Sequence, residues 1–368
     1  MLLNAVQSFC RFQRVSYGSY AMRITIICIL SVIGAVYSTV QRGKQNFPML
    51  RGVNRSGTEY ACIKGDGIFD SPYDDATIEN MKKWNINIVR VPLNEGCWFA
   101  RWVPRAEYAG DNYQTKIKEW VQKLRGHGLY VIVELHWTEG LYKGPAQGAC
   151  YEYGAKCQKP MPNQEVSIDF WKDVANMFKG DEGIIFDLFN EPFPDRAIED
   201  RDQAWRCWKN GGDDCPGFEY RVAGMQDLVY AVRNTGAKNL IMLGGLNFAN
   251  DLEGWTNYLP YDPAYNVAAS MHSYNFNSCI DKKCWDKGIG TIIKTHPVIV
   301  GEIGENDCSH QYIDKLMPYL EERGISYLGW TWNNWNCKDG PSLVKNYDGE
   351  PTKFGIGFKN FLAKVAHQ

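Results

Sequence analysis

Residues 184–192 form the stretch that decides the fold, Ile184-Ile185-Phe186-Asp187-Leu188-Phe189-Asn190-Glu191-Pro192. An apolar run ends in a polar Asn-Glu step, and the proline that follows cannot extend a strand. Nearly continuous apolar character is typical of a parallel strand that is covered on both faces. The stretch therefore predicts a buried parallel strand with a glutamate at its carboxyl end.

Short apolar runs of this kind alternate with helical patterns along the chain. The expected strands span residues 48–54, 86–92, 129–135, 183–189, 240–244, 267–271, 297–301 and 326–331. The expected helices span residues 80–84, 116–125, 170–178, 221–232, 311–322 and 357–365. This order predicts an α/β fold, the (β/α)8 TIM barrel, as a single domain. A doubly wound open sheet is the alternative, but no glycine-rich dinucleotide turn follows the first strand.

Two long segments, residues 138–164 and 195–217, follow the third and fourth strands and are expected to be disulfide-closed insertions on the catalytic face. Of the twelve cysteines, Cys10 and Cys28 precede the domain. The ten that remain suit an oxidising compartment. Zinc binding is the rival interpretation, but the expected pairs lack C-x2-C spacing. These pairs are Cys62–Cys97, Cys150–Cys157, Cys207–Cys215, Cys279–Cys284 and Cys308–Cys337.

Residues 24–40 form a nearly uncharged apolar run that follows Arg23. The run is shorter than the roughly 20 residues that span a bilayer, and it ends in small residues, as in a secretory signal peptide. Residues 1–40 are therefore expected to be a signal peptide, with Met22 as an alternative start and a membrane anchor as the alternative role. Residues 41–368 would then form the catalytic domain of a secreted protein that is free of the membrane after signal removal.

The charge and the aromatic content of the chain limit which kinds of molecule it can bind. With 40 Lys and Arg against 42 Asp and Glu, the net charge is −2, and no basic field is available to hold nucleic acid. The 13 Trp and 21 Tyr exceed what a core requires, and we hypothesise that some of these rings stack on sugars. Because no His-x-x-x-His spacing is present, neither a metal nor another cofactor is expected. We expect a monomer.

A second glutamate ends the seventh strand, in Pro297-Val298-Ile299-Val300-Gly301-Glu302. Functional residues of a (β/α)8 barrel gather at the carboxyl ends of the strands, so Glu191 and Glu302 are expected to lie close together. Retaining hydrolysis of a glycosidic bond needs two carboxyl groups about 5–5.5 Å apart, one as acid and base and the other as nucleophile. The pair therefore predicts a retaining β-glycosidase.

This set of strand ends resembles glycoside hydrolase family five, in clan A, over nearly the whole of the expected domain. The Asn-Glu-Pro step is the most specific part of the resemblance, which implies Glu191 as general acid and base and Glu302 as nucleophile. The other implied residues lie in Val89-Arg90-Val91-Pro92, Glu134-Leu135-His136-Trp137, Met271-His272-Ser273-Tyr274 and Gly329-Trp330-Thr331-Trp332-Asn333. The resemblance implies that Arg90 supports the nucleophile and that His136 contacts the substrate. It also implies that Asn190 binds the 2-hydroxyl of the sugar and that Trp332 is the aromatic platform under this sugar. His272 and Tyr274 would be the pair of site residues on the sixth strand.

These assignments also make physical sense. An arginine beside Glu302 would favour its ionised form, and Tyr274 could donate a hydrogen bond to it. Glu191 must carry a proton near neutral pH, so its pKa should lie above that of Glu302. Trp332 is preferred over Trp330 because it lies nearer the end of the strand. Glu134 is interpreted as structural, and Glu305 as a loop residue.

The resemblance is to endo-β-1,4-glucanases in particular, which implies that the enzyme is a cellulase with a β-glucan polysaccharide or oligosaccharide as substrate. Residues around Gly244-Gly245-Leu246-Asn247 and Tyr274-Asn275-Phe276-Asn277 carry this part of the resemblance. An endo-β-mannanase is the nearest alternative, followed by a β-1,3-glucanase or an exo-glucosidase. A catalytically inactive carbohydrate-binding protein on the same barrel is the alternative from another functional class.

Overall fold

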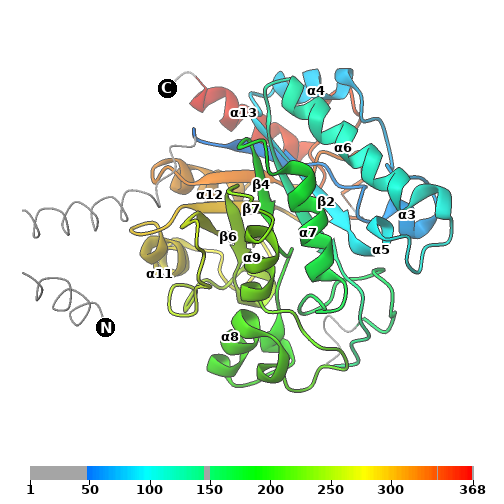
Figure 1. Cartoon of the computed structure of the whole chain (residues 1–368). Coiled ribbons are helices and arrows are strands. Elements are labelled where there is room, and N and C mark those ends of the chain that lie inside the picture. Colours follow the sequence, from blue (N-terminus) through cyan, green and yellow to red (C-terminus); the bar gives the residue numbers. More distant parts are fainter. Residues whose placement is uncertain (1–47, 145–149, 338, 367–368) are drawn as a thin grey trace, which may run out of the picture. The chain divides into compact units, whose positions relative to one another are not determined.

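Eight parallel strands close into a barrel, in the chain order β1 to β8, in a computed structural model that describes residues 48–144, 150–337 and 339–366. Helices lie around the strands (Figure 1). The barrel confirms the predicted (β/α)8 fold. The expected signal peptide, residues 1–40, lies outside the described residues.

Each of the eight expected strands is present, although several bounds differ. β6 and β7 continue past the expected ends to Tyr274 and Gly304, because the polar residues that extend them are buried at the barrel mouth. β8 stops earlier, at Gly329. The strands are β1 (Arg51–Asn54), β2 (Ile88–Asn94), β3 (Tyr130–Trp137), β4 (Ile184–Asp187), β5 (Ile241–Gly244), β6 (Val267–Tyr274), β7 (Val298–Gly304) and β8 (Ser326–Gly329).

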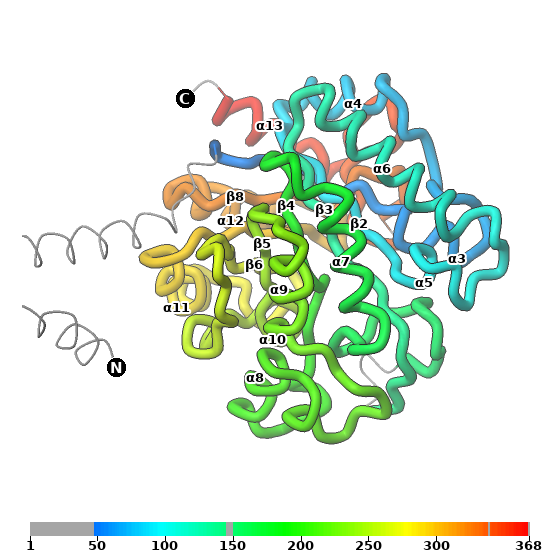
Figure 2. Tube along the Cα trace, in the orientation of Figure 1, coloured from blue at the N-terminus to red at the C-terminus, as the bar shows by residue number. Residues whose placement is uncertain are grey.

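The helices that follow the strands bury one apolar stripe each. In α6, Ile117, Trp120, Val121 and Leu124 are buried, as their helical spacing predicts. Figure 2 shows the helices around the strands. The longer helices are α4 (Asp75–Lys82), α6 (Asp111–Gly126), α7 (Ser167–Phe178), α8 (Arg201–Asn210), α9 (Met225–Arg233), α11 (Lys282–Ile292), α12 (Ile313–Glu321) and α13 (Lys353–Val365), and the single-turn helices are α3 (Ala61–Lys64), α5 (Glu95–Trp98) and α10 (Leu246–Ala249). Among these described helices, none has the length and apolarity to cross a membrane.

The two insertions carry structure of their own. α8 lies in the insertion after β4, where the Cys207–Cys215 disulfide ties its last turn to the loop that follows. The Cys150–Cys157 disulfide closes part of the insertion after β3. All five expected disulfides are formed, which confirms the pairing read from the sequence.

An apolar layer fills the lower part of the barrel and determines which side chains face the mouth. It consists of Leu50, Ile88, Ile132, Ile185, Leu240, Met242, Ala268, Ile299 and Leu328. Because side chains alternate along a strand, residues two or four positions further along point into the barrel as well. This alternation brings Asn54, Arg90, Glu134, Asp187 and His272 into the barrel above the apolar layer.

Candidate active site

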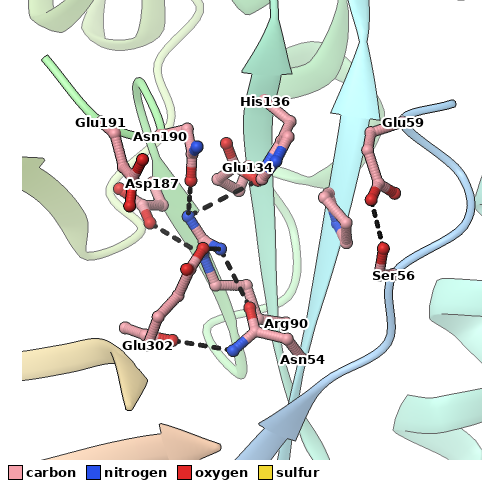
Figure 3. A network of polar contacts seen from close by, with 12 residues as sticks. Asn54, Ser56, Glu59, Arg90, Glu134, His136, Asp187, Asn190, Glu191 and Glu302 are labelled. Atoms are coloured by element: carbon pink, nitrogen blue, oxygen red, sulfur yellow. Dashed lines mark hydrogen bonds and ion pairs between the residues drawn. The ribbon is translucent and has the colours of Figure 1, made fainter. Parts of the chain in front are cut away.

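A buried arginine holds the polar layer together (Figure 3). Arg90 donates hydrogen bonds to Asn54 Oδ1 at 2.9 Å, Asp187 Oδ2 at 3.0 Å, Asn190 Oδ1 at 3.0 Å and Glu302 Oε1 at 2.7 Å. Its Nη2 atom also lies 3.5 Å from Glu134 Oε2. One guanidinium therefore positions side chains from four other strand ends.

The polar layer around Arg90 holds three carboxyl groups but only one guanidinium. Glu134, Asp187 and Glu302 all form ion pairs with Arg90, and all four side chains are buried. Burial opposes the charge of Arg90, but the three carboxyl groups more than offset it and raise its pKa. Burial also raises the pKa of Asp187, and the neighbouring Glu134 adds to this effect although Arg90 opposes it. Burial and the neighbouring carboxyl groups therefore favour the protonated form of Asp187.

Glu302 is held between two donors. Its Oε1 accepts from Arg90, and its Oε2 accepts from the hydroxyl of Tyr274 on the neighbouring strand β6. Only 3 % of the residue is exposed. Both contacts suit a carboxylate, which only accepts hydrogen bonds.

Glu191 has different surroundings. Its Oε1 lies 2.9 Å from Nδ1 of His272, and its Oε2 accepts a 3.0 Å hydrogen bond from the side-chain amide of Gln158. Burial raises the pKa of Glu191 and lowers that of His272 to about 4, so this imidazole is neutral near neutral pH. A carboxyl group with a raised pKa beside a neutral histidine suits a general acid.

The two carboxyl groups lie close together, because oxygens of Glu191 and Glu302 and a ring nitrogen of His272 lie within 4.8 Å of one another. In another setting such a trio could hold a metal ion. Here Arg90 already pairs with Glu302, and Tyr274 donates to its other oxygen, so the charge that would attract a cation is already compensated. The arrangement places the carboxyl groups of Glu191 and Glu302 side by side, with His272 between them as a neighbour of both.

Two further groups border this pair. His136 Nδ1 lies 3.0 Å from Glu134 Oε2. Burial alone would lower the pKa of His136, but the Glu134 carboxylate raises it to about 9, so this imidazole carries a charge near neutral pH. Asn190 uses its side-chain oxygen to accept from Arg90, so its amide nitrogen is the atom that can donate to a substrate hydroxyl.

The prediction that Trp332 is the aromatic platform under the sugar is wrong. Trp332 is fully buried and packs edge-on against Trp84 at 4.8 Å between ring centroids, so its ring has no exposed face for a sugar. The partly exposed Trp330 stacks on the ring of His136 instead, with centroids 5.5 Å apart and planes at 10°. Both tryptophans lie past the end of β8 at Gly329, so strand alternation does not settle the direction of either ring. The contacts settle it instead, because Trp330 stacks on His136 and Trp332 packs on Trp84.

This geometry agrees with what comparison with known proteins finds. Residues 45–336 match the family model "Cellulase (glycosyl hydrolase family 5)". The chain belongs to glycosyl hydrolase family 5. The match includes every strand of the barrel and both carboxyl groups.

The relatives of this chain include both a mannanase and a cellulase. A mannan endo-1,4-beta-mannosidase from Cellvibrio japonicus is 23 % identical over 96 % of this chain and 72 % of its own length. The cellulase CelDZ1 from Thermoanaerobacterium sp. is 24 % identical over 69 % of this chain and 60 % of its own length. Among solved structures, the beta-glucanase SdGluc5_26A from Saccharophagus degradans in complex with cellotetraose superposes with a TM-score of 0.64 at 20 % identity, covering 86 % of this chain and 88 % of the other.

Three residues of this family 5 site were not anticipated from the sequence. Asp187 was read as part of an apolar strand, although its place two residues after Ile185 puts it in the inward-facing set. Asn54 is the last residue of β1, and it accepts a hydrogen bond from Arg90 and donates one to the carbonyl of Gly301 at 2.9 Å. Gln158 lies in an insertion, and no periodic signal identifies such a residue.

Glu134 and Glu305 have structural contacts, as expected. Glu134 is fully buried between Arg90 and His136. Glu305 accepts hydrogen bonds from the backbone N–H groups of Tyr312 and Ile313, at 2.7 and 3.0 Å, and so caps the start of α12. Neither carboxyl group is available to react.

The two tryptophans give a paired prediction. Trp330→Ala is expected to raise KM for oligosaccharides on the order of tenfold, because the ring face available to a sugar is lost. The melting temperature should fall less than in Trp332→Phe, because Trp330 is partly exposed and loses only its stacking on His136. Trp332→Phe is expected to lower the free energy of unfolding by about 1–2 kcal/mol through a cavity against Trp84, with KM unchanged. Steady-state kinetics and chemical denaturation of both variants measure the difference, and the reverse pattern would restore Trp332 as the platform.

Proposed function

We propose that this family 5 protein is a retaining endo-β-1,4-glucanase, with Glu191 as general acid and base and Glu302 as nucleophile. The separation of the two carboxyl groups carries the retaining mechanism in this proposal. Oxygens within 4.8 Å fit the short spacing of about 5–5.5 Å between carboxyl groups that double displacement uses, and they lie closer than the roughly 6.5–9.5 Å that inversion uses.

The first step follows from the different surroundings of the two groups. Glu191, whose pKa is raised by burial, donates its proton to the glycosidic oxygen as the bond to the anomeric carbon breaks. Glu302 attacks that carbon through one oxygen, and Arg90 and Tyr274 keep its carboxylate oriented. The products are a shortened chain and a glycosyl ester on Glu302.

The second step reverses the roles. Once Glu302 is esterified, its negative charge no longer opposes ionisation of Glu191, so the Glu191 carboxylate can take a proton from water. This water attacks the anomeric carbon, and Glu302 leaves as a carboxylate that Arg90 again pairs with. The neutral His272 lies beside Glu191 without competing for its proton.

Two observations bear on the substrate. The structural neighbour SdGluc5_26A is a beta-glucanase crystallised with cellotetraose, which supports a β-1,4-glucan. A second candidate, endo-β-mannanase, is supported by the Cellvibrio japonicus relative and by the catalytic domain of a mannanase from Streptomyces sp. SirexAA-E, which superposes with a TM-score of 0.58 at 20 % identity, covering 84 % of this chain and 83 % of the other.

The substrate test uses carboxymethyl-cellulose, glucomannan, galactomannan and mixed-linkage glucan, with viscosity and reducing ends measured together. We expect a rapid fall in viscosity with few new reducing ends on carboxymethyl-cellulose and none on galactomannan. The opposite preference would identify the endo-β-mannanase. Reducing ends without a fall in viscosity would contradict endo action.

We also propose that the enzyme is secreted and works as a monomer. Five disulfides in one domain are typical of proteins that fold in an oxidising compartment. Both carboxyl groups and Arg90 come from this one chain, which supports a site that is complete without a second copy. Detection of the protein in culture medium and its elution volume in size-exclusion chromatography test these two points.

A further inference from the structure

The insertion after β3 sends one side chain to the proposed acid and base. Gln158 donates from Nε2 to Oε2 of Glu191 at 3.0 Å and to the backbone carbonyl of the same residue at 3.2 Å. One amide group thus holds both the side chain and the main chain of Glu191. The strands supply the other contacts of this carboxyl group, and Gln158 adds a donor from outside the barrel.

Both neighbours of Gln158 are anchored. Cys157 is joined to Cys150 by a disulfide. Lys159 is fully buried and donates from Nζ to the carbonyl oxygens of Glu152 and Gly154, at 2.9 and 3.2 Å. A side chain with anchors on both sides is held in place, so its contact with Glu191 does not depend on a freely moving loop.

The loop is also fastened to the segment that carries Glu191. The backbone N–H of Phe193 donates to the carbonyl of Pro160 at 3.0 Å. This bond lies two residues after Glu191 in the chain and two residues after Gln158 in the insertion. The two side chains are therefore joined through backbone as well as through their own hydrogen bond.

We propose that Gln158 is a positioning residue, which fixes the orientation of the Glu191 carboxyl group and sets the pH above which acid catalysis is lost. The proposal rests on the proposed function, because it needs Glu191 to be the acid. The physical reason is that an N–H donor stabilises the ionised form of a carboxyl group more than the protonated form. The hydrogen bond from Gln158 accordingly opposes the effect of burial on the pKa of Glu191.

Other groups that face Glu191 are titratable or charged, and they stay unchanged when Gln158 is replaced. They are Arg90 on β2, Glu134 and His136 on β3, Asp187 on β4, His272 and Tyr274 on β6, and Glu302 on β7. Gln158 is neutral, so its replacement by an apolar residue changes no charge in the site. A change in the pH profile would then report the lost hydrogen bond alone.

The test is the pH dependence of kcat/KM for Gln158→Leu on a cello-oligosaccharide. A hydrogen bond to a charged group is strong enough to move a pKa by about one unit. Because its loss raises the pKa of the acid, the alkaline limb should move to higher pH by about one unit. On an aryl cellobioside with a good leaving group, which needs little acid catalysis, kcat/KM should change less than it does on the cello-oligosaccharide.

Two variants control the measurement. Gln164→Leu changes a glutamine of the same insertion whose side-chain oxygen accepts from Arg221, and its profile should match that of the wild type. Gln158→Met, closer in shape to glutamine, replaces Gln158→Leu should the leucine variant not fold, as judged by circular dichroism. An alkaline limb that stays in place, or one that moves equally in Gln164→Leu, would overturn the proposal. Loss of the aryl cellobioside reaction in a folded Gln158 variant would also count against it.

A separate outcome identifies a failure of the proposed function. Glu191→Gln should lose oligosaccharide turnover and the alkaline limb together, since it removes the acid itself. A Glu191→Gln variant that keeps both would show that Glu191 is not the acid. A Gln158→Leu profile equal to the wild type, beside an inactive Glu191→Gln, would reject only the role of Gln158.

Discussion

Glu302→Gln is expected to lower kcat/KM by at least about 10⁴-fold on every β-glycoside substrate, whatever its leaving group. The amide is nearly the same size as the carboxylate, so it can keep some of the contacts with Arg90 and Tyr274, but it cannot form the glycosyl ester. Because the nucleophile acts in every turnover, a better leaving group does not compensate for its loss.

Glu191→Gln should behave differently and serves as the matched variant. General acid catalysis contributes about 10²–10⁴-fold, and mainly when the leaving group is a poor one. We therefore expect a loss in this range on cello-oligosaccharides and a much smaller loss in the first step with a dinitrophenyl cellobioside. Pre-steady-state release of dinitrophenolate separates that step from the second. If the two variants depended on the leaving group in the same way, the assignment of roles would be wrong.

Arg90→Met is expected to destabilise the protein by about 3–5 kcal/mol at neutral pH, because it leaves the buried carboxyl groups of Asp187 and Glu302 without a cation and Glu134 with His136 alone. Activity should be lost as well, since Glu302 loses the donor that orients it. Urea denaturation of the variant and the wild type measures the difference in the free energy of unfolding.

The free energy of unfolding of Arg90→Met should also depend on pH in a definite direction. Without Arg90, Asp187 should keep its proton to a higher pH in the folded state, while in the unfolded state it ionises near pH 4. The folded state then binds more protons than the unfolded state, so the stability of the variant should fall as the pH rises above about 4. The destabilisation should be smallest in acid.

Arg51→Met is the control for this measurement. Arg51 pairs with Glu321 at 2.6 Å, but its side chain is 22 % exposed and water can solvate the partner left behind. The expected loss is below about 1 kcal/mol. An equal loss in the two variants would show that the three carboxyl groups do not depend on Arg90.

The order of strands and most of the site could be predicted because both follow from local patterns. Apolar runs indicate buried strands, and the barrel brings their carboxyl ends together. Of the eight expected site residues, the structure brings seven together, namely Glu191, Glu302, Arg90, His136, Asn190, His272 and Tyr274. The roles proposed for them remain to be tested by the variants above.

The misses have physical causes. Trp332 was expected at the site because it lies nearer the expected end of the eighth strand than Trp330 does. The direction of a side chain past the end of a strand depends on how the chain leaves the barrel, which the sequence pattern does not determine. Gln158 reaches Glu191 through an insertion that is anchored by a disulfide and a buried lysine, which are tertiary contacts. α11 was not predicted, because Gly288 and Gly290 have low helix propensity, although Asp281 caps its start.

The most direct test of the central claim is to trap the covalent intermediate. The enzyme is incubated with a 2-deoxy-2-fluoro disaccharide that carries a good leaving group and matches the polysaccharide the enzyme degrades, and its peptides are then analysed by mass spectrometry. We predict one fluoroglycosyl group per protein, attached to Glu302, and none in Glu302→Gln. An adduct on another residue, or hydrolysis without any adduct to give a product of inverted configuration, would contradict the account.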